Sequence, residues 1–168
     1  VSLDLLAGLV DNMFTHGFRR IVFLNGHGGN IVPSSQAVFE ARQRYRDRND
    51  LLLLSATYWR LGAKPKEKIP GLVQDVMEHA CEWETSMILR LAPHLVGKID
   101  GLEPISGRDA FEPSAHGWIT LDRSTPGHIG DPRNATPEKG EALLELFSDD
   151  VCSFLERVIA WTGRSWND

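Results

Sequence analysis

The chain has 168 residues, with 18 Lys and Arg against 23 Asp and Glu, and therefore a formal net charge of −5. This length fits one domain with its own hydrophobic core, so we expect residues 1–168 to form a single domain. The mildly acidic balance, without a basic block, argues against an electrostatic nucleic-acid binder. No apolar run approaches the roughly 20 residues that cross a bilayer, so no membrane partner is expected. The 2 cysteines do not make a disulfide framework, and a reducing, cytoplasmic location is the default expectation.

The first third of the chain alternates helical and strand-like patterns. Apolar residues recur every three to four positions over residues 3–16, which predicts an amphipathic helix with Gly17 just past its end. Residues 20–24 are largely apolar without alternation, which predicts a strand buried on both faces of a parallel sheet. A second helix is predicted over residues 33–48 and a second buried strand over residues 51–57. This order predicts an α/β fold with layers of helix, parallel sheet and helix.

The remaining chain has weaker patterns until its end. Residues 62–71 are rich in Lys and Pro, which predicts a solvated loop. A third helix is predicted over residues 84–91. Residues 97–133 are rich in Gly and Pro and have no clear period, so we expect short strands and long loops there. A Thr-Pro pair then predicts the start of a long last helix over residues 137–161.

The loop of residues 25–30, Asn-Gly-His-Gly-Gly-Asn, follows the first predicted strand. It therefore lies at the carboxyl edge of the sheet, where ligand sites in open α/β sheets collect. Glycines let the backbone approach a ligand, and His27 among them can bind a metal with Asn25 or Asn30 orienting it. A tight turn with an incidental histidine is the alternative. A phosphate-binding loop is a weaker one, because the usual Gly-rich patterns are missing.

A second motif, Glu-His-Ala-Cys-Glu-Trp-Glu-Thr-Ser, occupies residues 78–86. It gathers three carboxylates and one histidine just ahead of an apolar helix. Acidic side chains at a helix start have a structural explanation, because they favour the positive end of the helix dipole. The functional explanation is that one carboxylate faces a cation while His79 moves protons. The helical His-Glu-x-x-His zinc pattern is absent, because no second histidine follows at that spacing.

These two motifs resemble the creatininase (creatinine amidohydrolase) family. A third segment, residues 127–140, is similar to the closing segment of that family, and the three motifs come in the family's order. The combination is specific for the family and weak for the substrate. The resemblance implies an α/β fold and a centre of two divalent metal ions, commonly zinc, manganese or iron. It also implies hydrolysis of amide-type bonds in small, often cyclic, molecules.

The resemblance assigns roles to individual residues. It makes His27 a metal ligand and His79 the catalytic histidine that handles protons near the scissile bond. Glu84 is implied as a carboxylate at or next to the metals and Glu82 as a second catalytic residue, although which of the two faces a metal stays open. Gly29 stands where creatininase itself has a metal-binding glutamate, a departure that marks a subgroup of the family.

Substrate contacts are expected from both strand ends. The loop residues expected to bind substrate are Asn25, Gly28, Gly29 and Asn30. Trp59, after the second strand, matches a pocket tryptophan of the family, although a core tryptophan is an equal alternative. Asp75 stands where creatininase has another pocket tryptophan, which suggests a polar substrate other than creatinine. Cys81 replaces a family glycine and is interpreted as structural, with a nucleophilic role as the less favoured alternative.

Three functions follow from the resemblance. The first is a metal-dependent amidohydrolase that cleaves a non-peptide C–N bond with metal-activated water. The second keeps the family and changes the bond, as in a deformylase, a peptide hydrolase or a hydrolase of a cyclic polyol ketone. The third is a catalytically inactive module of a homo-oligomer, since the family often forms hexamers.

The resemblance also implies where the remaining ligands of the metal centre come from. In the family, the other metal ligands come from a segment before the helix predicted at residues 3–16. We therefore expect the chain to be a C-terminal portion that lacks this segment. The missing ligands are then expected from an N-terminal segment or a companion chain, and the 168 residues alone are expected to be inactive.

Overall fold

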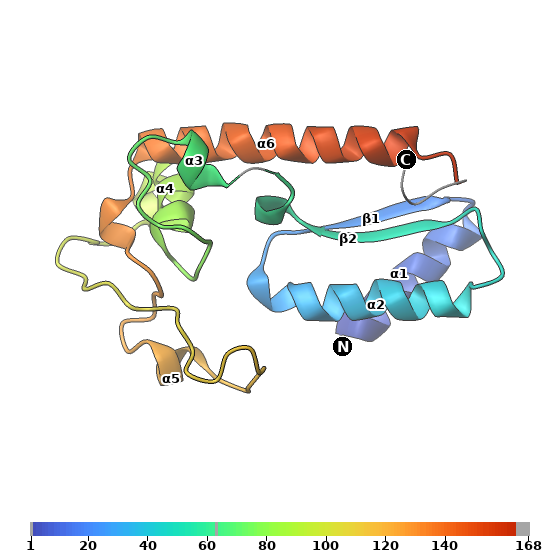
Figure 1. Ribbon diagram of the computed structural model, residues 1–168, viewed down its shortest axis with the longest axis horizontal. Coiled ribbons are helices and arrows are strands. Elements are labelled where there is room, and N and C mark those ends of the chain that lie inside the picture. The colour runs from blue at the N-terminus through green and yellow to red at the C-terminus, as the bar shows by residue number, and fades with distance from the viewer. Residues whose placement is uncertain (1, 63, 164–168) are drawn as a thin grey trace. The chain divides into compact units, whose positions relative to one another are not determined.

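The computed structural model describes residues 2–62 and 64–163, which fall into two compact units (Figure 1). Within the described residues, unit 1 holds residues 2–62 and 149–163, and unit 2 holds residues 64–148. This division describes packing within the chain, and the single domain expected from its length stays a prediction. No helix among these residues is long and apolar enough to cross a membrane.

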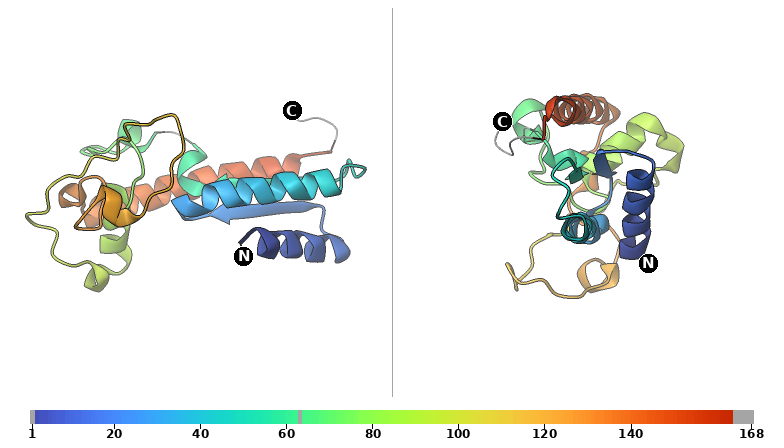
Figure 2. Two further views of the ribbon diagram at one scale, coloured as in Figure 1. Left: turned by 90° about the horizontal axis from the view of Figure 1, so that it is seen from below. Right: turned by 90° about the vertical axis from the view of Figure 1, so that its right-hand side faces the viewer.

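Unit 1 is a layered α/β structure. Its elements are α1 (Ser2–Thr15), β1 (Arg20–Asn25), α2 (Ile31–Arg44), β2 (Leu52–Thr57) and the last part of α6 (Pro137–Ala160). The two strands pair in parallel, with Arg20 opposite Leu52 and Asn25 opposite Thr57. Helices α1 and α2 lie on one side of the strands and the end of α6 on the other (Figures 1 and 2). The predicted order of helix, parallel sheet and helix is confirmed.

Helix α1 ends at the glycine that the sequence marks. Gly17 has a φ of +90°, and its N–H donates to the Phe14 carbonyl at 3.0 Å. The Phe18 N–H donates to the Met13 carbonyl at 3.1 Å, which completes a Schellman turn. A side chain is strained at such a positive φ, so glycine is the residue that lets the chain turn from α1 into β1.

The core of unit 1 fills the space between the helices and the strands. Its buried members are Val10, Phe14, Ala41, Leu51 and Leu53. The Phe14 ring meets the ring of Tyr45 edge to face, with centroids 4.8 Å apart. Full burial of a Val, Leu or Phe side chain contributes about 1.5–3 kcal/mol to the stability of the fold. The helical period and the apolar runs that predicted the elements also deliver these side chains to one cluster.

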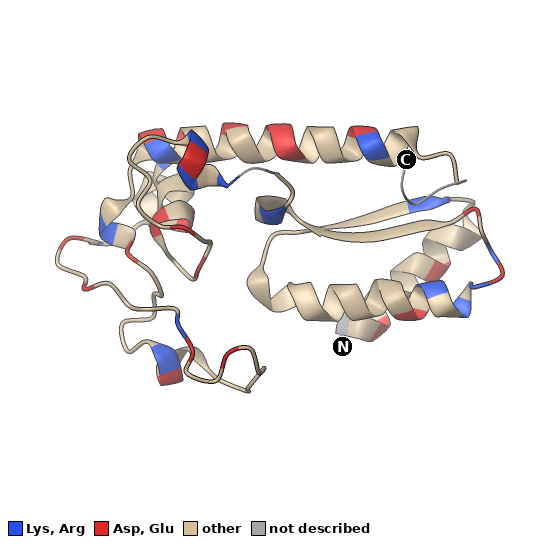
Figure 3. Cartoon of the chain, viewed as in Figure 1, with Lys and Arg blue, Asp and Glu red and all other residues tan. Residues whose placement is uncertain are grey.

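The two strands differ in burial. β2 is buried at both ends, as predicted, but β1 is not buried on both faces, since Leu24 is 51% exposed. Among the described residues β1 pairs with β2 alone, so its other edge has no neighbouring strand. Figure 3 shows that the strands carry no charge apart from the start of β1, where Arg20 lies. The apolar run predicted the strand correctly and its full burial wrongly.

Unit 2 consists of helices and long loops. It contains α3 (Pro65–Lys68), α4 (Glu82–Leu91), α5 (Thr120–Arg123) and the start of α6. The solvated loop predicted for residues 62–71 is wrong in part, because it includes α3 with Pro65 and Ile69 buried. Within the described part of residues 97–133, the one strand-like pairing is the antiparallel bridge of Ile105 and Gly130. The rings of Trp83 and Phe147 pack at a centroid distance of 6.1 Å and join α4 to α6.

The Schellman turn gives a test of the α1 terminus. We expect Gly17→Ala to lower the free energy of unfolding by about 1 kcal/mol, because alanine is strained at positive φ. The matched change Gly8→Ala lies inside α1, where an added Cβ meets no atom within 4 Å. It should raise the free energy of unfolding by about 1 kcal/mol through helix propensity. Urea unfolding measures both, and shifts of the same sign would contradict this account.

Candidate active site

Asn25 shapes the turn that follows β1. The side chain is 6% exposed, and its Nδ2 donates to Thr57 Oγ1 at 3.0 Å. Its Oδ1 accepts the N–H of His27, also at 3.0 Å. The amide thus ties the ends of the two paired strands together and fixes where the loop leaves the sheet. Its expected substrate contact stays a prediction, and the structure adds this anchoring role.

His27 is the exposed N-terminal cap of the 3₁₀ turn η1 (Gly28–Asn30). Its backbone is extended, and its Nδ1 accepts the Gly29 N–H at 3.1 Å. This hydrogen bond assigns the neutral tautomer that carries its proton on Nε2. An ideal Cβ at Gly29 would lie 3.1 Å from the imidazole, so the ring packs closely over this glycine. Metal binding through Nε2 therefore requires His27 to change tautomer and release Gly29.

The other expected contacts of this loop are solvent-accessible. Gly28 and Asn30 are exposed, and the Asn30 side chain makes no capping hydrogen bond. Trp59 lies in the 3₁₀ turn η2 (Tyr58–Arg60), directly after β2, and its half-buried ring meets Tyr58 at 5.0 Å. Because the strands end in register, the residues after β1 and after β2 share one edge of the sheet. Unit 1 thus gathers the polar loop and an aromatic ring at that edge.

His79 lies in unit 2, in the turn that leads into α4. Its side chain is exposed, and its carbonyl accepts the Ile129 N–H at 2.7 Å. The next residue, Ala80, has a φ of +48°. A non-glycine residue in this region costs roughly 1–2 kcal/mol, and such strain gathers at functional sites. No sequence pattern marks an alanine for this conformation, so Ala80 could not be selected from the sequence.

Glu84 offsets the strain at Ala80. Its Oε2 accepts the Ala80 N–H at 2.5 Å, and Thr85 Oγ1 donates to the Ala80 carbonyl at 3.2 Å. Glu84 is half-buried in the first turn of α4, where its charge also favours the helix dipole. Its other oxygen, Oε1, accepts no hydrogen bond from the described residues. Glu84 can therefore hold the turn and still offer one oxygen to a cation.

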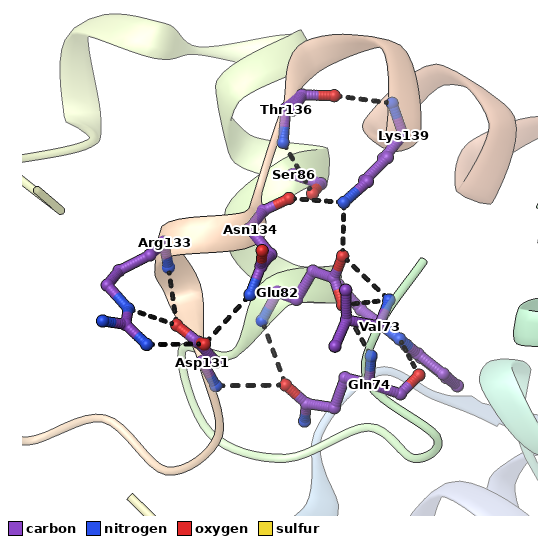
Figure 4. A network of polar contacts seen from close by, with 10 residues as sticks. Val73, Gln74, Glu82, Ser86, Asp131, Arg133, Asn134, Thr136 and Lys139 are labelled. Atoms are coloured by element: carbon purple, nitrogen blue, oxygen red, sulfur yellow. Dashed lines mark hydrogen bonds and ion pairs between the residues drawn. The ribbon is translucent and has the colours of Figure 1, made fainter. Parts of the chain in front are cut away.

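Glu82 is fully buried at the start of α4, in the network of Figure 4. Its oxygens accept the Val73 N–H at 2.9 Å and the Gln74 N–H at 2.7 Å. Lys139 Nζ donates to Oε1 at 2.6 Å, and the lysine side chain is 15% exposed. Both carboxylate oxygens are thus taken by protein donors. This geometry favours an anchoring role for Glu82, and its catalytic role stays a prediction.

Gln74 is a member of this network that sequence reasoning missed. Its Oε1 accepts the N–H groups of Glu82 and Asp131, each at 3.3 Å. Its Nε2 donates to the Val76 carbonyl at 2.8 Å and to Glu78 Oε2 at 3.0 Å. One side chain therefore joins three segments of unit 2. Its partners lie up to 57 positions away in the chain, so no local signal could have found it.

Asp75 and Cys81 also have defined surroundings, and the expected substrate contact of Asp75 stays a prediction. Asp75 is exposed and pairs with Lys66 at 2.8 Å, so this carboxylate lies on the surface of unit 2. Cys81 is fully buried, and burial raises the pKa of its thiol. A raised pKa disfavours the reactive thiolate, which supports the structural role over the nucleophilic one.

The metal ligands expected from the sequence belong to different units. His27 lies in unit 1 and Glu84 in unit 2. Among the described residues, no three His, Cys, Asp or Glu side chains form a group that could hold a metal ion. A protein metal centre usually needs three or four ligands. The described residues therefore do not by themselves fit a complete metal centre.

Comparison with known proteins identifies the family. The creatininase family (creatinine amidohydrolase) matches residues 1–155. The chain belongs to the creatininase family, as its motifs and its layered fold indicated. Creatinine amidohydrolase of known structure superposes with a TM-score of 0.76 at 25% sequence identity, over 96% of this chain and 64% of that one. A neighbour described as creatininase Mn and a mutant creatininase of the Zn-Zn type share the fold.

Two curated relatives carry different activities. The mycofactocin precursor peptide peptidase of Mycolicibacterium smegmatis (strain ATCC 700084 / mc(2)155) is 31% identical over 146 residues, or 84% of this chain and 49% of that protein. The creatinine amidohydrolase of Pseudomonas putida is 26% identical over 152 residues, or 82% of this chain and 55% of that protein. The chain thus spans about half the length of the curated relatives it matches.

The buried ion pair gives a test of the network in unit 2. We expect Lys139→Met to lower the free energy of unfolding by about 3 kcal/mol, because the buried Glu82 side chain loses its cation. Lys66→Met is the matched control, since its ion pair with Asp75 is exposed. That change should cost less than about 0.5 kcal/mol. Denaturant unfolding of the two variants measures the difference, and equal effects would contradict the anchoring role.

Proposed function

We propose that the protein is a metal-dependent hydrolase that cleaves an amide-type bond in a small, polar substrate. The observation that carries this proposal is the loop of residues 25–30, held by Asn25 at the carboxyl edge of a parallel sheet. This edge is where open α/β folds bind their ligands. The amidohydrolase and peptidase activities of the two relatives support the same class of reaction.

The proposal gives separate roles to the residues of each unit. Divalent metal ions, when bound, activate water and polarise a carbonyl group. His27 and Glu84 each offer one ligand, and we propose that further ligands come from polypeptide outside the described residues. His79, exposed and held through its carbonyl, donates a proton to the leaving nitrogen. Trp59 provides an aromatic surface against which a flat substrate can stack.

Hydrolysis of a peptide bond is the second candidate function. The relative that favours it, at 31% identity, is a precursor peptide peptidase. Asp75, which stands where creatininase has a pocket tryptophan, is exposed and also argues against a closed pocket for creatinine. Assays of the full-length protein on creatinine, N-formyl compounds, cyclic polyol ketones and short peptides separate the candidates. Turnover of peptides alone would select the second one.

The ligand role of His27 is tested by metal content. We expect His27→Ala to lower the zinc or manganese bound by the full-length protein and to lower its hydrolytic rate at least 100-fold, roughly the upper range for disturbed metal sites. His94→Ala is the control, because His94 is an exposed residue of another turn, η3 (Pro93–Leu95). Elemental analysis of both variants measures the metal. Unchanged metal content in His27→Ala would overturn the assignment.

The proton-transfer role of His79 predicts a different pattern. His79→Ala should lower kcat by roughly 100-fold or more while the bound metal stays at its wild-type level. Steady-state kinetics together with elemental analysis provide the measurement. A loss of metal together with activity would make His79 a ligand instead.

A further inference from the structure

Unit 2 contains a pocket that none of the roles above uses. Its volume is about 350 Å³, and Val73, Pro104 and Ile105 form apolar parts of its wall. Two carboxylates, Glu78 and Asp131, line it as well. The pocket adjoins the segment that carries His79. Glu78, which lines the pocket, directly precedes His79. Gly130, which also lines it, follows Ile129, whose N–H donates to the His79 carbonyl.

The Glu78 carboxylate is incompletely paired. It is half-buried, and Gln74 Nε2 donates to its Oε2 at 3.0 Å. Its Oε1 lies against Gly107, where an added Cβ would come within 1.5 Å of that oxygen. No other side chain or backbone donor among the described residues reaches the carboxylate. A carboxylate has capacity for about four hydrogen bonds, and leaving a partly buried charge short of partners costs free energy.

The neighbouring charges do not supply that partner. Asp131 is itself neutralised, since Arg133 Nε and Nη2 approach its two oxygens at 3.0 and 3.1 Å. The Arg123 guanidinium donates to the Gly107 carbonyl and lies 4.7 Å from the centre of the Trp118 ring. Burial raises the pKa of Glu78 above its ordinary value, and the charge of Arg123 lowers it by less. Of the two carboxylates that line the pocket, Glu78 is therefore the one without a paired cation.

We propose that this pocket is a substrate subsite for a protonated amine or guanidinium group on a short apolar stem, with Glu78 as its anchor. The proposal rests on the hydrolase function above and specifies that the enzyme favours substrates with such a cationic group. A cation in the pocket forms a charge-assisted hydrogen bond with Glu78, and its stem contacts Val73 and Ile105. Glycine at positions 107 and 130 leaves room for these side chains, since an added Cβ would collide with Glu78 at Gly107 and with Gln74 at Gly130.

Binding of butylammonium to the full-length protein tests the subsite without turnover. Titration followed by NMR should show that butylammonium binds at least tenfold more tightly than its neutral analogue 1-butanol. Glu78→Gln keeps the size of the side chain and an acceptor for Gln74, and it should weaken butylammonium binding at least tenfold. Glu103→Gln is the matched control. It also removes one negative charge, but Glu103 precedes Pro104 in the chain and does not line the pocket, so this variant should bind butylammonium as tightly as wild type.

Two further measurements make the test decisive. Val73 is an exposed residue of the pocket lining, so Val73→Phe narrows the pocket and leaves both carboxylates unchanged. This variant should also weaken butylammonium binding. Lowering the pH through the raised pKa of Glu78 should weaken binding in wild type and not in Glu78→Gln, while Asp131, Arg123 and Arg133 stay paired. Equal binding of butylammonium and 1-butanol, or wild-type affinity in Glu78→Gln, would overturn the subsite. Neither result would touch the metal and turnover tests of the hydrolase proposal.

Discussion

The buried ion pair of Glu82 and Lys139 is the interaction on which unit 2 depends. A carboxylate that is fully removed from water is tolerated only when its oxygens find enough donors to offset the lost hydration. Here the donors come from Lys139 and from the backbone at Val73 and Gln74, which are distant segments of the chain. Satisfying one charge therefore brings the start of α4, the start of α6 and the preceding loop together. The loop that carries His79 is closed between Gln74 and Glu82, so the position of its main chain follows from the same pair.

The sequence predicted the elements whose signal is local. Helix α1 and its end at Gly17, strand β2 and the last helix follow from period and turn residues, and each is found within a few residues of its predicted range. The structure differs from the sequence-based prediction where tertiary contacts determine the local conformation or the burial. Helix α3 exists because Pro65 and Ile69 are buried, which a Lys- and Pro-rich composition conceals. The partial exposure of β1 has the same origin, since an apolar run reports the chemistry of a strand and not the number of its neighbours.

The candidate site shows the same limit at the level of single residues. The motif of residues 78–86 contains three carboxylates, and the sequence left open which of Glu82 and Glu84 faces a metal. Burial and hydrogen-bond partners distinguish the three. Glu82 is enclosed and fully paired, Glu84 is half-buried and holds Ala80 with one oxygen, and Glu78 faces a pocket with a single amide partner. The histidines were easier to select, because a histidine among glycines or beside a helix start has few structural explanations. Gln74 and Lys139 could not be selected, because their roles are defined by partners that the fold alone brings near.

The two ligands expected from the sequence differ in what metal binding would require of the protein. Glu84 has two oxygens, so it can stabilise the strained turn at Ala80 through Oε2 and bind a cation through Oε1 at the same time. His27 in its neutral form has one lone pair, and the Gly29 N–H already occupies it. A metal at His27 must therefore replace that hydrogen bond, and the 3₁₀ turn that the imidazole caps loses its N-terminal support. Glycines at positions 28 and 29 suit such a loop, because they let the backbone adopt another conformation at little steric cost. Metal binding and the shape of this loop are thus coupled through a single nitrogen atom.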